Sequence, residues 1–371
     1  MTDELDGELD ALRSAIDAAD DAIIRLLNER AKVALQIGAI KARHAQRAYV
    51  PERERLVLDR LVSTNQGPLP EESLRLIYKE IISASLALES PLEVAYLGPE
   101  ATFTHEATKR HFGLSARLNP RRTIPDVFAD VEHGRCEYGV VPIENSTEGV
   151  VNHTLDTFVA SELGISAEIL LEVSHQLLTR SGDLTGITKV YSHPQALAQC
   201  RGWLDSNLPG VAQVDVSSTA RAAQLAGEDD GAAAVASDLA ASLYGLEIAA
   251  SRLEDAHANL TRFLVIGRDA PAPTGVDRTS VMFALKDAPG ILFRALEPFA
   301  RSEINMSRIE SRPSRRRAWD YLFFIDLDGH LAEPRVAEAI AELETACQFM
   351  KVLGSYPQGR LAQLAGRRRG P

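Results

Sequence analysis

An apolar stripe runs through the first forty or so residues without a proline to interrupt it, and it constrains the fold more than any other feature. Apolar residues recur every three or four positions, as on the buried side of an α-helix: Leu9, Leu12, Ile16, Ala19, Ile23, Leu26, Val33, Ile37 and Ile40. A helix of about forty residues is ~60 Å long. A helical monomer of about ninety residues cannot cover that length, so the stripe predicts an intertwined dimer.

Two positive charges lie on or beside this stripe. Arg30 occupies a stripe position, where a guanidinium group is costly unless it meets a carboxylate or an anionic ligand. Lys41 follows three helical turns later and shares its face, because each residue advances the helix by ~100°. Arg13 falls ~100° away from Arg30. We therefore expect Arg13 to serve a neighbouring subunit.

Two further helices are predicted. The second begins at about Pro51 and the third spans 71–89, and the glycine and prolines within 67–70 separate them. Arg53 lies in the first turns of the second helix. On the third helix an apolar row ends in a hydroxyl and a carboxyl group on one side: Tyr78, Ile82, Ser85 and Glu89. Each charged residue alone is typical of a surface salt bridge. Together they indicate a pocket.

Over about ninety residues the chain resembles the all-helical chorismate mutase family, at Arg13, Asn28 to Lys32, Lys41 and Pro51 to Arg55. The resemblance implies a dicarboxylate site, with Ser85 as a binding residue. Arg13 from one subunit, Arg30 and Arg53 would hold the two carboxylates, and Lys41 and Glu89 would donate to the ether oxygen. A Claisen rearrangement requires only a compact bound conformer and positive charge beside the breaking C–O bond.

The chain departs from this family at two positions. Glu89 stands where many relatives carry Gln, and a carboxyl group donates a hydrogen bond only when it is protonated. We therefore expect mutase activity to fall as pH rises through a raised pKa of Glu89. Val50 stands where some relatives place a charged side chain, so a backbone group or a water molecule would have to make the corresponding contact in the pocket.

From Val94 to Ile266 short apolar strands alternate with helix-like stretches, which predicts an α/β domain. Expected elements are strands at 94–97, 140–142 and 189–191 and a helix at 219–226. Four polar clusters are each expected to follow a strand and line a crevice: 96–107, 140–149, 192–199 and 259–263. Alone, Glu144 or Asn145 is most simply a helix cap, and His193 a loop histidine with satisfied hydrogen bonds.

The stretches YLGPEATFTHEA, VPIENSTEG, SHPQALAQC and NLTRFLVIG resemble the prephenate dehydratase family, in its order, over about 175 residues. The resemblance implies two α/β lobes similar to periplasmic binding proteins, with the site between them. Thr261 is then the essential residue, donating a hydrogen bond to the departing hydroxyl oxygen. The other expected pocket residues are Glu144, Asn145, Ser146, Ser192, Gln199, Arg262 and Phe263. Ser217 replaces a Glu of some relatives, which argues against a second catalytic carboxyl group.

After a linker at 271–275, the predicted order is a strand at 280–285, a turn at 287–290, a helix at 291–302 and strands at 306–311 and 321–326. This order resembles the α+β, ferredoxin-like ACT module, which binds amino acids at dimer interfaces. Two stretches match those of the phenylalanine-sensing version: Gly290, Ile291, Leu292 and Glu310, Ser311, Arg312, Pro313. The simpler alternative is a dimerisation domain.

Composition limits the remaining choices. A net charge of −12 and a pI near 5.3 argue against nucleic acid as a partner. No apolar run approaches a membrane span, and the acidic start predicts a cytoplasmic protein. Cys136, Cys200 and Cys347 lack the spacing of a metal or redox pair and are expected to be buried thiols. No residue set suggests a metal or organic cofactor.

We therefore expect a multidomain protein: an all-α mutase domain at 1–90, a dehydratase domain at 93–268, an ACT domain at 278–358 and a basic tail at 359–371. It would convert chorismate to prephenate and then to phenylpyruvate, with inhibition by phenylalanine, as a homodimer or higher homo-oligomer. Two alternatives stay open. The helices could serve only for dimerisation, although Arg30 in the stripe argues against this, or the chain could be a non-catalytic amino-acid sensor.

Overall fold

The computed structural model describes residues 2–44, 49, 51–255, 259–286, 288–313 and 321–359. The basic tail beyond residue 359, Val50 and Asp287 of the predicted turn lie outside these ranges. The chain divides into two compact units, residues 1–92 with 112–117, and residues 93–111 with 118–364.

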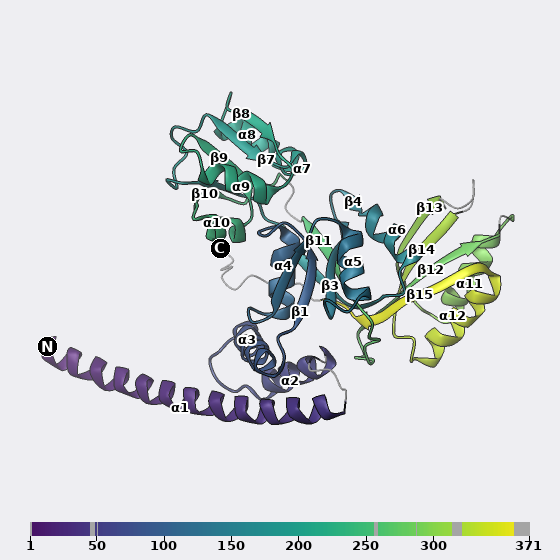
Figure 1. The fold of residues 1–371 in the computed structure, drawn as a ribbon, viewed down its shortest axis with the longest axis horizontal. Helices are drawn as coiled ribbons and strands as arrows, with labels where there is room; N and C mark the ends of the chain where they lie inside the picture. Colours follow the sequence, from purple (N-terminus) through teal and green to yellow (C-terminus); the bar gives the residue numbers. More distant parts are fainter. Residues whose placement is uncertain are drawn as a thin grey trace. The chain divides into compact units, whose positions relative to one another are not determined.

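The first unit is helical, as predicted. Its helices are α1 (Thr2–Arg43), α2 (Pro51–Thr64) and α3 (Glu71–Glu89). Within this unit α3 lies against the C-terminal part of α1 (Figure 1). Arg75 of α3 donates to Asp59 of α2 over 2.8 Å, which joins the two shorter helices.

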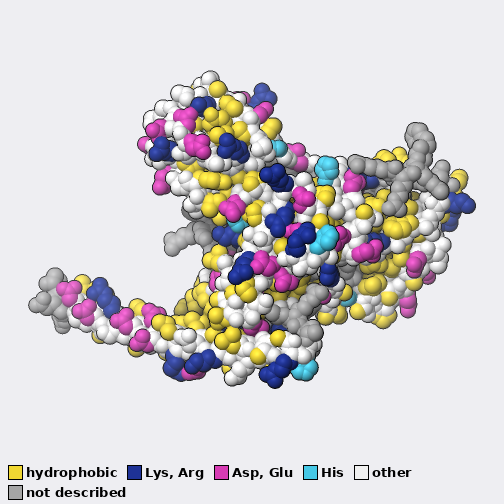
Figure 2. Space-filling model, viewed as in Figure 1, with side chains coloured by type: hydrophobic (Ala, Val, Ile, Leu, Met, Phe, Trp, Pro, Cys, Tyr) yellow, Lys and Arg dark blue, Asp and Glu magenta, His cyan; other side chains and the backbone are white. Residues whose placement is uncertain are grey.

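The apolar stripe of α1 stays largely uncovered within one chain. Leu12, Ile16 and Ile23 are 64%, 61% and 52% exposed, and Ile37 beyond them is 46% exposed. Figure 2 shows hydrophobic and charged side chains together on the surface of α1. A row of exposed aliphatic side chains of this length is typical of an interaction surface.

The second unit begins with a mixed sheet in the order β2-β1-β3-β11-β5, with β4 paired to β3. The strands are β1 (Glu93–Leu97), β2 (Arg117–Arg121), β3 (Tyr138–Asn145), β4 (Gly149–Val150), β5 (Gly164–Glu172) and β11 (Leu260–Gly267). The helices of this lobe are α4 (Phe103–Phe112), α5 (Ile124–Glu132) and α6 (Asn152–Ala160). β11 runs antiparallel to both β3 and β5.

This antiparallel strand corrects one prediction. The clusters at 96–107 and 192–199 begin at the ends of β1 and β7, but residues 140–145 lie inside β3 and residues 260–263 lie inside β11. Antiparallel pairing brings the start of β11 to the end of β3, so Thr261 lies opposite Asn145. The polar residues still meet at one edge of the sheet, although β11 is antiparallel and the loops lining such a crevice usually follow parallel strands. A turn and β4 also separate Ser146 from α6, where a helix was expected to begin directly.

The second lobe is a five-stranded sheet in the order β10-β6-β9-β7-β8. Its strands are β6 (Gln176–Thr179), β7 (Lys189–Ser192), β8 (Ala212–Asp215), β9 (Ala232–Ala236) and β10 (Glu247–Ser251). Its helices are α7 (Pro194–Gln199), α8 (Arg201–Asn207), α9 (Thr219–Gly227) and α10 (Asp238–Tyr244). Alternate residues of β9 pack with α9 and α10 on one face and with α7 and α8 on the other, so helices cover both faces.

The C-terminal module has the order β12 (Asp277–Leu285), α11 (Ile291–Arg301), β13 (Met306–Pro313), β14 (Tyr321–Asp328), α12 (Pro334–Ala346) and β15 (Cys347–Pro357). Its antiparallel sheet, β13-β14-β12-β15, is ferredoxin-like, as the resemblance implied. The sequence analysis predicted neither α12 nor β15.

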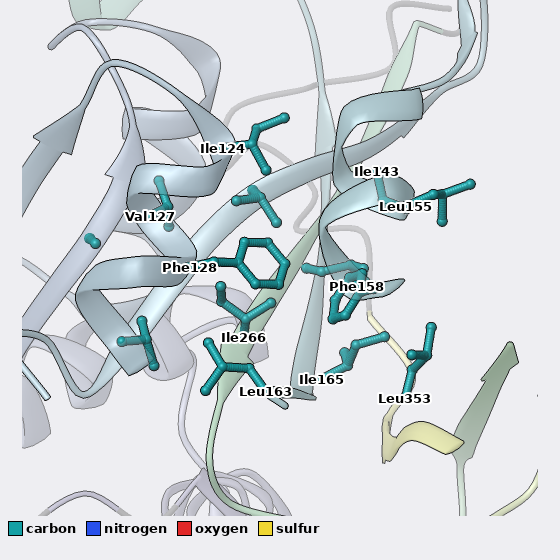
Figure 3. Close-up of a cluster of buried hydrophobic side chains, with 14 of the residues drawn as sticks. Ile124, Val127, Phe128, Ile143, Leu155, Phe158, Leu163, Ile165, Ile266 and Leu353 are labelled. Atoms are coloured by element: carbon teal, nitrogen blue, oxygen red, sulfur yellow. The ribbon is translucent and has the colours of Figure 1, made fainter. Parts of the chain in front are cut away.

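The first lobe and the C-terminal module share one apolar core. Met282, Phe324, Leu353 and Tyr356 of the module are buried in the same cluster as Phe128 and its neighbours in the first lobe. Figure 3 shows Leu353 near Ile165 of β5. At Gly354 an added Cβ would lie 2.5 Å from the Ile165 carbonyl oxygen, so the β15 and β5 backbones pack directly against each other.

Cys136 and Cys200 are buried, as expected, whereas Cys347 is only half-buried. No helix among the described residues is long and apolar enough to cross a membrane.

Candidate active sites

The first site lies between α1 and α3. Arg30 donates from Nη1 to the Ser85 hydroxyl and, over 3.4 Å, to the Ile81 carbonyl oxygen. Ser85 is buried and donates to the same carbonyl over 2.7 Å. The guanidinium group in the stripe therefore meets neutral oxygens in this chain, with no carboxylate partner shown among the residues described.

Glu89 lies one helical turn beyond Ser85 and packs over Gly38 of α1. A Cβ added to Gly38 would lie 2.7 Å from the Glu89 Cγ, so only glycine admits this approach. Burial raises the pKa of Glu89, and nearby Lys41 opposes that rise. Its Oε2 atom is buried and has no hydrogen-bond partner in the described part of the chain. A protonated Glu89 would be able to donate from this position.

The other two predicted mutase residues are exposed in a single chain. Arg13 is exposed and pairs with Asp10, one turn away, over 2.9 Å. Arg53 is exposed near the start of α2. One chain thus brings Arg30, Ser85, Lys41 and Glu89 together, whereas Arg13 lies seventeen residues before Arg30 on α1, too far along the helix to join them.

The second site is built around Thr261 and Asn145, which lie opposite each other on β11 and β3. The Asn145 Oδ1 accepts hydrogen bonds from the backbone N–H groups of Thr147 and Glu148, over 2.9 and 3.0 Å. The amide nitrogen must therefore face the other way, where it donates to Thr261 Oγ1 over 2.8 Å and to Asn259 Oδ1 over 2.7 Å. Because Thr261 Oγ1 accepts here, its own proton is available for another acceptor.

This hydrogen-bond chain continues into the second lobe. Asn259 Nδ2 donates to Gln199 Oε1 over 3.0 Å, and Gln199 Nε2 donates to Glu148 over 3.2 Å. His175 Nε2 lies 2.9 Å from the same Gln199 oxygen, which makes it the protonated ring nitrogen. Burial lowers the pKa of His175, which favours the neutral ring.

His175 and Asn259 belong to the two segments that connect the lobes. These segments are hydrogen-bonded to each other, Val173 N to Asn259 O over 2.8 Å and Leu253 N to His175 O over 2.9 Å. The sequence analysis did not predict His175 as a site residue, because a single histidine between two strands forms no recognisable motif. Asn259 was within a recognised cluster, yet it was not predicted as a site residue.

Four predicted pocket residues have other surroundings in the structure. Ser192 is fully buried and donates to the Val235 carbonyl oxygen over 2.6 Å. Phe263 is 1% exposed. Arg262 and Glu144 pair with each other across β11 and β3, on the sheet face opposite Thr261 and Asn145 because strand side chains alternate. Ser146 lies beside the site, where its hydroxyl accepts from the Leu260 N–H over 2.9 Å.

Arg262 makes ionic contacts with the C-terminal module. Its Nη1 lies 2.6 Å from Asp326 and its Nε 2.6 Å from Glu168, and Nη2 donates to the Tyr356 hydroxyl over 2.9 Å. Glu144 lies 3.3 Å from Arg308 Nε of β13. The expectation that Arg262 and Glu144 contact substrate therefore gains no support from this arrangement.

The two predicted sensing stretches lie on different elements of the module. Gly290 has a φ of 71° and is the N-cap of α11, whose first residues, Ile291 and Leu292, are half-buried. Glu310, Ser311, Arg312 and Pro313 form the end of β13. Arg312 Nη1 pairs with Asp156 of α6 over 2.7 Å and donates to the Asn152 carbonyl oxygen over 2.6 Å. Among the described residues no cluster of three or more His, Cys, Asp or Glu is suited to a metal ion.

Three family models match successive parts of this chain. Chorismate mutase type II matches residues 12–90, prephenate dehydratase matches 94–271 and the ACT domain matches 279–345. These matches fall on the helical unit, the two lobes and the C-terminal module.

Two solved structures each match 72% of this chain. The prephenate dehydratase of Arthrobacter aurescens in complex with L-Phe is 37% identical, with a TM-score of 0.67, over 72% of this chain and 90% of that one. A chain described as GqqA, a novel type of quorum quenching acylase, is 32% identical, with a TM-score of 0.67, over 72% of this chain and 98% of that one. Since one fold hosts different chemistries, the fold alone does not assign the reaction.

Comparison with curated relatives spans nearly the whole chain. The bifunctional chorismate mutase/prephenate dehydratase of Aquifex aeolicus is 51% identical over 96% of this chain and 99% of the relative. The protein of the same name from Pseudomonas aeruginosa is 44% identical over 95% and 99%. With all three domains present in this order, the chain belongs to the family of bifunctional chorismate mutase/prephenate dehydratases.

Proposed function

We propose that this protein rearranges chorismate to prephenate in its helical domain and converts prephenate to phenylpyruvate between its two α/β lobes. Phenylalanine binding to the ACT domain lowers the second activity. The protein works in the cytoplasm, in keeping with the biosynthetic chemistry of its relatives. The observation that carries this proposal is the pair of separate polar sites in one chain, Arg30 with Glu89 and Thr261 with Asn145.

In the mutase step, Arg30 binds one carboxylate of chorismate while Lys41 and a protonated Glu89 donate to the ether oxygen. This oxygen gains negative charge as its bond to carbon breaks, so donors fixed beside it stabilise the transition state more than the substrate. The partner subunit supplies Arg13 and completes the dicarboxylate site, and Arg53 approaches from α2. The exposed α1 stripe supports this dimer, because a second copy of α1 offers a matching apolar surface.

In the dehydratase step, loss of carbon dioxide sends an electron pair into the ring and expels the ring hydroxyl. Thr261 donates a hydrogen bond to that oxygen and keeps its own proton, and the departing hydroxide takes a proton from solvent to become water. Asn145 keeps the Thr261 hydroxyl turned toward the substrate, since it occupies an acceptor position of Oγ1. Gln199 and Asn259 hold the amide chain in one orientation.

Ultraviolet absorbance with purified protein tests the proposal directly. Chorismate should be consumed and phenylpyruvate formed, prephenate alone should also yield phenylpyruvate, and phenylalanine at millimolar or lower concentration should slow that second reaction. Binding of phenylalanine without turnover of either substrate would instead support the non-catalytic sensor.

A further inference from the structure

His175 is a buried histidine that takes no part in the reaction steps proposed above. It is 2% exposed and lies between β5 and β6, in one of the two connections between the lobes. Its backbone N–H donates to Glu254 over 2.8 Å, and its carbonyl oxygen accepts from the Leu253 N–H over 2.9 Å. The Phe103 ring lies nearly perpendicular to the imidazole, with 5.5 Å between the ring centroids. Both the backbone and the ring of His175 are therefore held in place by the protein itself.

The two ring nitrogens of His175 have different surroundings. Nε2 lies 2.9 Å from Oε1 of Gln199, an oxygen that can only accept, so Nε2 carries the proton. Nδ1 is buried and has no hydrogen-bond partner in the part of the chain that the structure describes. A second proton on Nδ1 would be a buried donor without an acceptor, so these surroundings favour the neutral ring. His175 therefore offers a single N–H group, and that group donates to Gln199.

The Gln199 side chain, at the end of α7 in the second lobe, receives this hydrogen bond. Its backbone is held separately, because its carbonyl oxygen accepts from the Asp255 N–H over 2.8 Å. Its side-chain oxygen accepts from both His175 and Asn259, and its nitrogen donates to Glu148 of the first lobe. An amide turned by half a revolution would set its own N–H groups against those two donors. The two donors therefore fix which end of the amide meets the first lobe.

We infer that His175 is a positioning residue of the dehydratase site and that it acts through Gln199. Its N–H group holds the Gln199 amide in the orientation that continues the hydrogen-bond chain to Asn145 and Thr261. This rests on the proposed dehydratase function. The alternative is that His175 only fills space between the two connections. The two roles differ in their coupling, because the effect of a positioning residue on catalysis disappears once Gln199 is replaced, whereas the effect of a packing residue persists.

The test is a double-mutant cycle on kcat/KM for prephenate, measured without phenylalanine. His175→Phe keeps a ring beside Phe103 but removes the N–H donor. We expect kcat/KM to fall about 5- to 10-fold in the parent background, the size of one lost hydrogen bond. In a Gln199→Leu background the same change should cost less than about 2-fold, because the acceptor is already absent. His175→Gln, which can place an amide N–H near the position of Nε2, should recover part of the loss.

Controls separate this role from a loss of folding. Rates are normalised to the folded fraction from circular dichroism, and mutase activity in the same protein should be unchanged. His133→Phe is the matched control, because His133 at the end of α5 also donates to a carbonyl oxygen, that of Ala129, over 2.6 Å. This control should keep parental kcat/KM. Should His175→Phe fail to fold, His175→Met takes its place, since methionine has about the length of glutamine and no N–H group, and the same loss is expected.

Parental kcat/KM in His175→Phe or, if that variant does not fold, in His175→Met overturns the inference. An equal fall in the parent and Gln199→Leu backgrounds also overturns it, because His175 would then act independently of Gln199. A parent protein that does not turn over prephenate would refute the proposed dehydratase function itself, so the two failures are distinguishable.

Discussion

Asn145 donates a hydrogen bond to Thr261 across two antiparallel strands, over 2.8 Å, and the direction of that bond is fixed by two backbone N–H groups that occupy the Asn145 oxygen. The relationship leaves the Thr261 proton free. It also means that the pair depends on an amide, which can donate and accept, and not merely on a polar side chain at position 145.

The direction of this bond is testable with an isosteric change. Asn145→Asp accepts where the amide donated, so the Thr261 proton would turn toward it and away from substrate. We expect the kcat of dehydration to fall about 10²- to 10³-fold, as when one transition-state donor is lost. The kcat of Thr261→Ala should fall by a similar factor, and Thr261→Ser should keep part of the dehydratase activity. Unchanged mutase activity in each variant serves as the folding control, and near-parental dehydration by Thr261→Ala would refute the assignment.

The mutase activity should depend on the protonation of Glu89. Because burial raises its pKa, the carboxyl group keeps its proton to higher pH than an exposed glutamate, and activity should decline as pH rises through that raised value. Glu89→Gln donates at all pH values, so its profile should lose this decline. The measurement is kcat/KM for chorismate from pH 4 to 9, roughly spanning the carboxyl range. Identical profiles for parent and variant would contradict the assignment.

Gly38 should be required for the mutase site although it lies outside the predicted site residues. A Cβ at this position would lie 2.7 Å from the Glu89 side chain, so Gly38→Ala should displace Glu89 and lower mutase kcat about tenfold. Gly7→Ala is the matched control in the same helix, since no atom lies within 4 Å of its added Cβ. It should add up to ~1 kcal/mol of helix stability and leave activity unchanged. Equal effects of the two variants on kcat would count against this role of Gly38.

Exposure of the α1 stripe predicts an assembly that one charge would disrupt. Ile16→Glu should convert the oligomer to monomers in sedimentation analysis, because a carboxylate buried at an apolar interface is strongly unfavourable. Mutase activity should be lost with it, since Arg13 could no longer complete a neighbouring site. Unchanged dehydratase activity in the same variant would show that the rest of the chain is still folded. An Ile16→Glu protein that stays oligomeric with full mutase activity would exclude this interface.

Variants of Arg312 and of Asp156 can distinguish a contact of Arg312 with phenylalanine from its contact with α6. Its ion pair with Asp156 is partly exposed and contributes at most ~1 kcal/mol. Arg312→Ala and Glu310→Ala should both relieve phenylalanine inhibition, raising the inhibitory concentration at least tenfold. Asp156→Ala removes the ion pair but leaves Arg312 in place, and this variant should still be inhibited by phenylalanine. Persistent inhibition in both Arg312→Ala and Glu310→Ala would exclude the β13 end as the phenylalanine site.

Periodicity and chain order were sufficient to predict the helices, an α/β domain and the start of the C-terminal module, and the resemblance to prephenate dehydratase added the two lobes. The apolar stripe predicted α1 to within a few residues of Arg43, because helical spacing is a local property. The surroundings of the Arg262 side chain could not be predicted in the same way. The TRF motif identifies the residue, but which sheet face it occupies depends on the register of β11 with β3.

Long-range partners account for the remaining differences. Asp326 and Glu168 are far from Arg262 in sequence, and nothing local marks them as its partners. His175 is similar, since its role depends on how the two connections between lobes meet. The sequence predicted Thr261 and Asn145 as site residues, and the structure places them opposite each other, whereas contacts across domains required the folded chain.

The apolar core shared by the first lobe and the C-terminal module has a practical consequence for anyone wishing to abolish feedback control. Cutting the chain before β12 would strip Met282, Phe324, Leu353 and Tyr356 from the cluster and leave its lobe residues facing water. A shortened protein of that kind should aggregate instead of becoming a deregulated catalyst. Insensitivity to phenylalanine is better sought by single substitutions at the outer end of β13, which leave the common core untouched.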